Sequence, residues 1–359
     1  TFSLIKLFAS RLRKTWGAGV CMSQTMLCKN DDYIQPLGWV INATRQILYA
    51  IAQHTRPVFT RVEEEMGSRG ASLYLAQIAI GLEPERLGIA HVYNRRPYTN
   101  PEQIRLDLAE AVSLGWLEPM GEGVYRASPK SRDHFASLDG DIEPVYQGLA
   151  PLGTCQLEKM DRTLSTVVQA MRDMDGLDVK PSFDLDLKWG RREGPLLQRI
   201  CGKLSHILAY RDDAYVNAWM SQEVNSYVWE TFSCVYKGQA QTALEVYRCL
   251  GNCRHYGFET YDSALNELVD RGWLTQAAES YEPSDEGIKV LARVARSLNQ
   301  SFYKPWMVLE EDELQTLKDL IQSLAAALTV KKPKYGAGYA YINRTIGWGS
   351  VQWVRDKVC

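Results

Sequence analysis

Several residues combine types and spacings that metal sites and enzymes use. Cys249, Cys253 and His255 have the spacing of half a zinc site, but a structural zinc ion needs a fourth ligand and no second Cys/His pair follows. The five histidines are scattered, without the paired pattern of a zinc protease helix. We therefore expect reduced thiols at positions 249 and 253, with no metal, no cofactor and no enzymatic activity.

A second group of residues carries the donors that nucleic acids require. Lys and Arg supply most phosphate contacts, while Arg, Asn and Gln read base edges. The candidate DNA-binding residues form two clusters: Arg95, Arg96, Asn100, Gln103, Arg105, Arg126 and Lys130, and then Arg254 and His255. Acids accompany both clusters, and the second has the more acidic surroundings, with Glu259, Asp262, Glu267 and Asp270. The first cluster is therefore the more credible reader of DNA.

A helical pattern over residues 197–219 carries side chains that suit a small-molecule pocket. The candidate ligand-binding residues are Tyr210, Arg211, Tyr215 and Trp219. The alternative is that these rings belong to the core, because an apolar stripe at helical spacing is usually a packing face. For Arg211 and the two aspartates after it, an internal ion pair is favoured over catalysis.

The elements that must position these residues occur twice. One set of residues recurs 157 positions later: Leu108, Val112, Gly115, Trp116 and Leu117 become Leu265, Val269, Gly272, Trp273 and Leu274. In both copies a helix ends at a glycine, Trp-Leu begins a strand, a polar turn comes next, and a serine (Ser128 or Ser284) caps a new helix. This order predicts a winged helix, which is a helix-turn-helix with an added β-hairpin.

The helices that precede each hairpin complete the pattern. In the first copy we expect helices at 72–82, at 84–93 and from Asn100, which is predicted to be an N-cap before proline. In the second copy we expect them at 222–236, 242–250, 258–271, 284–302 and 309–328. The third helix of such a motif enters the DNA major groove, so the residues from Asn100 to Arg105 would lie at base edges.

Residues 47–330 resemble two tandem modules of the MarR-type winged-helix regulators. The resemblance rests on Gly-Trp-Leu before the hairpin, on Tyr-x-Pro-Ser-Asp-Glu-Gly at 281–287, and on the acidic start of a last helix at 309–314. The first copy departs from it, since Ser131 or Arg132 stands where the glycine is expected. The resemblance implies a transcriptional regulator that binds double-stranded DNA and senses a small aromatic ligand. The duplication implies a monomer acting as a pseudo-dimer, or a homodimer.

Two other functions stay open. The acidic residues favour, as the main alternative, a winged-helix module that binds a protein or a ligand without binding DNA. Some tandem winged-helix DNA glycosylases use a Gln-x-Gln motif, which Gln239 and Gln241 match. Such a short motif arises easily by chance, so a glycosylase is only a third hypothesis.

Composition and charge set the frame for these hypotheses. The chain has 359 residues, 45% of them hydrophobic and 23% charged, which is typical of a globular protein with two or three domains. No apolar run approaches the ~18 residues of a membrane span, and the eight separated cysteines favour a cytoplasmic protein. The net charge of −2 conceals an acidic middle: residues 47–330 contain 29 Lys and Arg against 40 Asp and Glu, a net charge of −11.

The predicted fold is mainly α with short β-hairpin wings (α+β), built from two winged-helix modules and a helical middle region. Residues 1–46 are expected to be a basic N-terminal extension without fixed structure, with a short amphipathic helix as the alternative. The first module would span 47–140, the connecting region 141–220, the second module with its C-terminal helices 221–330, and a basic tail 331–359.

Overall fold

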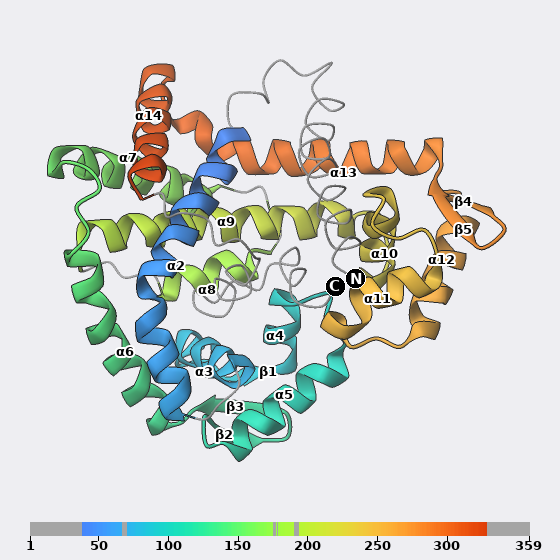
Figure 1. Cartoon of the computed structure of the whole chain (residues 1–359), viewed down its shortest axis with the longest axis horizontal. Helices are drawn as coiled ribbons and strands as arrows, with labels where there is room; N and C mark the ends of the chain where they lie inside the picture. Colours follow the sequence, from blue (N-terminus) through green and yellow to red (C-terminus); the bar gives the residue numbers. More distant parts are fainter. Residues whose placement is uncertain (1–37, 67–69, 175–176, 178, 190–193, 329–359) are drawn as a thin grey trace, which may run out of the picture.

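A computed structural model describes residues 38–66, 70–174, 177, 179–189 and 194–328 of the chain. Within these ranges the protein forms thirteen α-helices and two small antiparallel sheets (Figure 1). The prediction of a mainly helical fold with a few short strands is confirmed. None of the helices in the described ranges is long and apolar enough to cross a membrane.

Two segments of similar element order lie on a central helical body. The first unit (residues 70–147) comprises α3 (Gly70–Leu82), β1 (Leu87–Gly88), α4 (Ile89–Arg95), α5 (Pro101–Ser113), β2 (Leu117–Gly121), β3 (Val124–Ala127) and α6 (Pro129–Gln147). The second unit (residues 226–303) comprises α10 (Ser226–Tyr236), α11 (Ala243–Arg254), α12 (Phe258–Asp270), β4 (Leu274–Ala277), β5 (Ser280–Pro283) and α13 (Asp285–Tyr303). The central body contains α2 (Gly38–Met66), α7 (Thr154–Asp173), α8 (Pro181–Trp189), α9 (Leu196–Met220), a 3-10 turn at Lys304–Val308 and α14 (Glu311–Ala327).

The internal repeat corresponds to a repeated set of backbone contacts. Gly115 and Gly272 adopt left-handed φ angles of 74° and 70° and end helices α5 and α12. The serine after each hairpin donates its amide to the carbonyl of the repeated tryptophan, at 3.1 Å in the first unit and 3.0 Å in the second. Its hydroxyl accepts the amide three residues later, at 3.1 and 3.0 Å. The predicted caps at Ser128 and Ser284 are thereby confirmed.

The two units differ at the third helical position after this serine. In the second unit a side chain at Gly287 would bring its Cβ into a clash with the Trp273 carbonyl oxygen, so only glycine fits. In the first unit the equivalent residue is Ser131, whose hydroxyl donates to the Trp116 carbonyl at 2.5 Å. The departure from the glycine pattern is therefore compensated by an added hydrogen bond.

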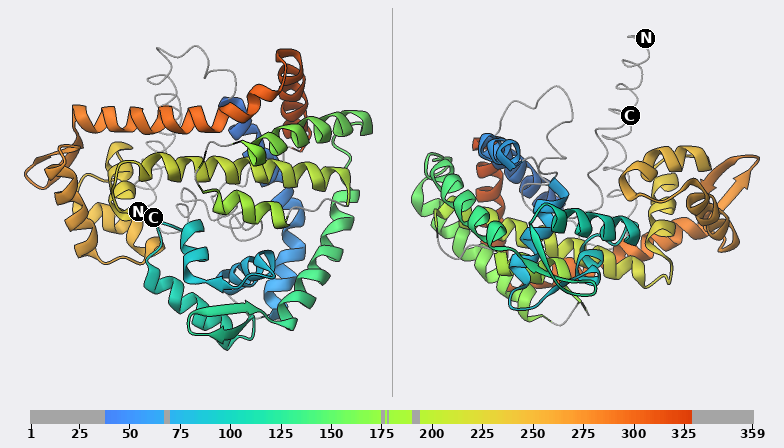
Figure 2. Two further views of the ribbon diagram at one scale, coloured as in Figure 1. Left: turned by 180° about the vertical axis from the view of Figure 1, so that it is seen from behind. Right: turned by 90° about the horizontal axis from the view of Figure 1, so that it is seen from below.

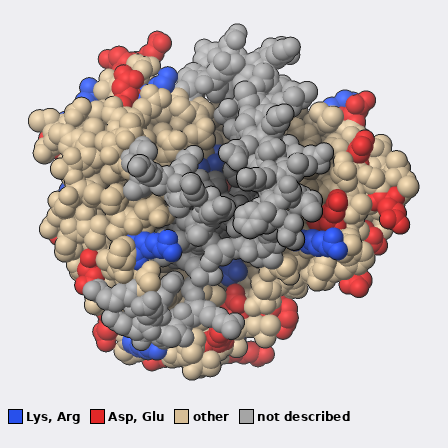
Figure 3. Space-filling view, viewed as in Figure 1, with Lys and Arg blue, Asp and Glu red and all other residues tan. Residues whose placement is uncertain are grey.

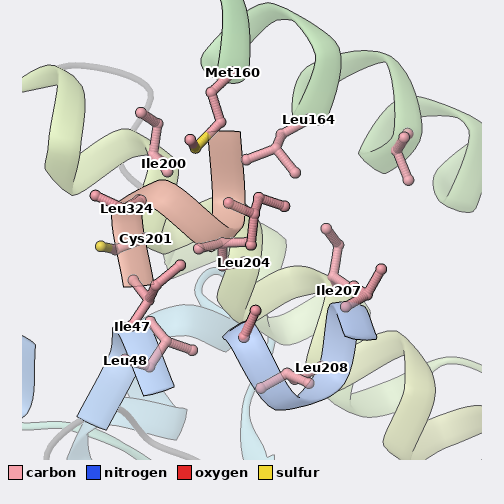
Figure 4. Close-up of a cluster of buried hydrophobic side chains, with 14 of the residues drawn as sticks. Ile47, Leu48, Met160, Leu164, Ile200, Cys201, Leu204, Ile207, Leu208 and Leu324 are labelled. Carbon is pink, nitrogen blue, oxygen red and sulfur yellow. The ribbon is translucent and has the colours of Figure 1, made fainter. Parts of the chain in front are cut away.

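The central core joins helices that are far apart in sequence. Side chains from α2, α7, α9 and α14 converge there, including Ile47, Leu164, Leu204 and Leu324 (Figure 4). Helix α13 runs beside α9 and connects this core to the second unit (Figure 2). Its residues Val290 and Val294 belong to the core of the second unit, whereas Phe302 belongs to the central core.

Several predicted boundaries are wrong for reasons of packing. Helix α2 begins at Gly38 and its Val40 is fully buried in the central core, so the N-terminal extension cannot reach residue 46. Helix α14 packs on α2 and α7, as part of the central core. The helix expected at 84–93 begins only at Ile89, because residues 87–88 pair with β3. Residues 1–37 and the predicted tail at 331–359 lie outside the described ranges.

Candidate functional site: a basic pocket beside the first unit

A pocket of about 1030 Å³ lies between the first unit and the central body. Its wall comes from α4, α7, α8 and α9 and from residues just after α3. Five cations line it, against two carboxylates from Glu85 and Asp184: Arg95, Arg172, Lys188, Arg199 and Lys203. Residues 47–330 carry a net charge of −11, so a pocket lined mainly by cations differs in sign from the rest of this region.

Helices α7 and α9 hold two of these cations on one carboxylate. Arg199, Lys203 and His206 recur at helical spacing on α9, so they share one face. Asp161 of α7 accepts Arg199 at 3.2 Å and Lys203 at 2.5 Å. One carboxylate cannot neutralise two cations, and this pair therefore keeps a net positive charge.

A buried pair from α8 and α9 forms another part of the wall. The Nδ1 atom of His206 lies 2.7 Å from a carboxylate oxygen of Asp186, and both side chains are buried. The carboxylate fixes the orientation of the imidazole ring. His206 lines the pocket, so its ring adds a polar group to the wall.

Helix α8 is attached at its first turn to both α9 and α4. Asp213 of α9 accepts the backbone amides of Ser182 and Phe183 at 3.1 and 2.8 Å. Burial raises the pKa of Asp213 to about 7, against the opposing effect of those amides and of Arg95. Arg95 of α4 donates to the Ser182 carbonyl at 3.5 Å. The pocket wall thus couples the first unit to the central body.

Two of the predicted DNA contacts, Arg254 and Arg95, have buried side chains in this structure. Arg254 is 7% exposed and makes a bidentate ion pair with Glu230, while Arg95 is 5% exposed and lines the pocket. Burial opposes the charge of Arg254, but attraction and hydrogen bonds from Glu230 outweigh it and raise the pKa of the guanidinium.

The N-terminus of α5, the helix predicted to enter the DNA major groove, lies against the second unit. Asn100 caps α5 as predicted, with its side chain accepting the Glu102 amide. The backbone N–H of Asn100 donates to the Arg254 carbonyl at 2.8 Å, and the Asn100 side chain donates through Nδ2 to the His255 carbonyl at 2.9 Å. Tyr98, two residues earlier, packs in the core of the second unit beside Trp219. Asn100 and His255 are therefore brought together, but by contact between the units.

The remaining predicted DNA-binding residues stay nearer the surface, and each has an intramolecular partner. Arg96 and Gln103 both contact Asp107, at 3.1 and 2.7 Å. The three most exposed cations pair within the first unit: Arg105 with Glu102, Arg126 with Glu118, and Lys130 with the Leu114 carbonyl. Around the second unit, acidic side chains gather on the face shown in Figure 3. The surface near α12 is thus poorly suited to phosphates.

The three aromatic side chains of the predicted ligand site pack in or against the cores. Trp219 stacks on Trp229 with ring centroids 6.3 Å apart, and the Trp229 indole donates to the Tyr215 hydroxyl at 2.8 Å. Tyr210 is fully buried against Phe183. Arg211 lies 4.0 Å from Asp212, which fits the expected ion pair only loosely. None of these four residues lines the pocket.

The basic pocket escaped sequence reasoning, although one signal was present. Arg199, Lys203 and His206 form a polar stripe on one face of α9, whose other residues are mostly apolar as far as Tyr210.

Within the described ranges no group of three His, Cys, Asp or Glu side chains is placed to hold a metal ion. The thiol of Cys253 donates to the Leu250 carbonyl of its own helix at 3.2 Å.

Comparisons with protein-family models, with curated proteins and with solved structures found no match to this chain.

Proposed function

We propose that this chain is a tandem winged-helix protein that binds a small anionic ligand in the basic pocket. The winged-helix assignment of each unit is supported by three helices followed by a hairpin, and by the repeated contacts at Gly115 and Gly272. The resemblance of the chain to two tandem MarR-type modules is part of this proposal.

The observation that carries the ligand function is the concentration of positive charge in the pocket. Ligand sites are typically concave, with a few convergent polar groups on an apolar lining. Here the lining combines five cations with Leu82, Val168 and Leu185, which are at least nine-tenths buried. Arg199 and Lys203 are already held by Asp161, so an anion would meet preorganised donors.

Binding of inorganic phosphate to the full chain tests this function, with sodium chloride matching the ionic strength. Phosphate at about 100 times its dissociation constant adds about 2.7 kcal/mol to the free energy of unfolding, which raises Tm by several degrees. Replacing Arg172 and Lys203 by alanine should abolish the shift. The matched control replaces Lys159 and Arg162, exposed on α7 and absent from the pocket wall. An equal shift in both double variants would contradict the proposal.

DNA-binding transcriptional regulation is the second candidate function. One observation favours it: Arg105, Arg126 and Lys130 are the more exposed cations and lie on α5, β3 and α6 of the first unit. The contact of Asn100 with the second unit opposes it, because the N-terminal residues of a reading helix are those that reach bases.

Fluorescence anisotropy of a labelled random-sequence duplex across a salt series distinguishes this second candidate. A DNA reader would lose affinity steeply with salt, and Arg105→Ala with Lys130→Ala would weaken binding further. Absence of binding at low salt would exclude DNA as the partner and leave the ligand function standing.

A further inference from the structure

We infer that the ligand of the basic pocket combines a dianionic head, of the phosphoryl kind, with an apolar body. The inference rests on the proposed ligand function and names the chemistry of that ligand. The charges of the wall specify the head, and the size and apolar residues of the pocket specify the body.

The head is specified by cations from two helices. The Arg199 and Lys203 side chains, 31% and 18% exposed, share Asp161, which is 15% exposed. Arg172 of α7 also lines the pocket and interacts electrostatically with Asp184 of the same wall. A phosphoryl group offers several acceptor oxygens and two charges, and Arg binds it through a planar fork of donors. A single carboxylate would leave part of this positive charge without a partner.

The body is specified by space that a phosphate ion cannot fill. Typical ligand pockets have volumes of about 300–1,000 Å³, and this pocket has about 1030 Å³. Leu82, Val168 and Leu185 form part of its wall and are 8%, 9% and 5% exposed. Covering their remaining apolar surface would stabilise the complex by the hydrophobic effect.

Gly202 supports the same conclusion from the backbone. It lies inside α9 between Arg199 and Lys203 and lines the pocket. A glycine inside a helix costs about 1 kcal/mol relative to alanine, and packing often explains it: at Gly251 an added Cβ would lie 2.6 Å from Tyr247. At Gly202 an added Cβ would meet no atom of the described residues within 4 Å. Its missing side chain therefore leaves open the space between the cations.

Isothermal titration calorimetry of the full chain with four probes tests this chemistry. The probes are 1-naphthyl phosphate, inorganic phosphate (the head alone), 1-naphthol (the body alone) and 1-naphthoate (a monoanionic head). We expect 1-naphthyl phosphate to bind at least about tenfold more tightly than each of the others, which corresponds to about 1.4 kcal/mol.

Two glycine variants test whether the open space beside Gly202 belongs to the ligand site. Gly202→Leu fills the space between the cations, so it should weaken both 1-naphthyl phosphate and inorganic phosphate, the former at least about tenfold, or about 1.4 kcal/mol. Gly140→Leu is the control, because Gly140 lies within α6, is exposed, and has equally open space around its added Cβ. At both helical glycines an added Cβ meets no described atom within 4 Å, so we expect both variants to fold.

The outcomes separate this inference from the proposed function. Equal affinity for phosphate and 1-naphthyl phosphate would overturn the apolar body and leave the anion site intact. Unchanged binding of 1-naphthyl phosphate to Gly202→Leu would overturn its placement beside Gly202. Equal affinity for 1-naphthoate or 1-naphthol would overturn the dianionic head. If no phosphate probe binds, the proposed function fails together with the inference.

Discussion

At the scale of single residues, Arg254 and Glu230 form a bidentate ion pair that water barely reaches. Two guanidinium nitrogens contact the carboxylate at 2.6–3.0 Å, and each side chain is only 9% exposed. The guanidinium also lies 5.7 Å from the ring centroid of Tyr98, which comes from the first unit. This buried charge network therefore helps to join the two units.

Removing one partner of this pair should strongly destabilise the protein. Glu230→Ala leaves a buried guanidinium without its counter-charge, which typically costs about 3–5 kcal/mol. Glu267→Ala is the control: its pair with Arg271 is 35% exposed on both sides, and such pairs contribute about 0–1 kcal/mol. Urea denaturation measures both losses. Similar small losses of unfolding free energy in both variants would show that the Glu230 carboxylate does not stabilise the contact between the units.

A second residue gives the fold a pH dependence. Burial raises the pKa of Asp213 from 3.8 to about 7, so the folded chain holds this proton more tightly than the unfolded chain. Its contribution to the free energy of unfolding is fully present at pH values below the pKa of Asp213 in the unfolded chain. This contribution is lost as the pH rises through the pKa of Asp213 in the folded chain.

Asp213→Asn should remove this dependence, because an amide does not titrate. Between about pH 4 and 7, the wild type should lose up to about 1.4 kcal/mol per pH unit relative to the variant. Urea denaturation of both proteins at several pH values measures the difference. Parallel pH profiles would mean that Asp213 is ionised throughout this range in the folded protein.

At the scale of elements, the two units differ in the first turn of the helix after the hairpin. The position held by Gly287 faces the Trp273 carbonyl, and the position held by Ser131 makes a hydrogen bond to the Trp116 carbonyl. The caps themselves were predictable, since serine and asparagine before a helix satisfy its free amides locally. The fit of the third position was not, because it depends on how closely the helix approaches the preceding strand.

Exchanging these residues should affect the two units unequally. Gly287→Ser introduces a Cβ that the backbone must move to admit, which we expect to cost about 1–3 kcal/mol or more. Ser131→Gly loses one hydrogen bond and some helix propensity, about 1–2 kcal/mol. Thermal or urea unfolding provides the comparison. A tolerated serine at position 287 would show that the second unit is looser than the structure indicates.

At the scale of the whole molecule, one short segment links the pocket to the contact between units. Arg95 lines the pocket, Tyr98 packs in the core of the second unit, and Asn100 binds backbone carbonyls of α11 and of the residue after it. Local patterns predicted the repeat and most helices. They could not predict the pocket, whose wall combines residues from position 82 to position 206, or the buried state of Arg254, which depends on Glu230.

Weakening the contact at Asn100 should loosen the two units without unfolding either one. Asn100→Ala removes the Nδ2 hydrogen bond to His255 and the α5 cap, at a cost of about 1–2 kcal/mol. We expect faster hydrogen exchange in residues 96–104 and at the end of α11, with the central core unchanged. Gln103→Ala is the control on the same helix. Uniformly faster exchange in all regions would indicate global destabilisation.

The most direct test of the central claim is to locate a bound dianion. In crystals of the full chain soaked with tungstate, a tetrahedral dianion of the phosphate type, we predict the strongest anomalous peak inside the pocket, beside Arg199 and Lys203. Peaks only at exposed cations such as Arg105 and Lys130, with an empty pocket, would contradict the assignment of an anion site at this junction.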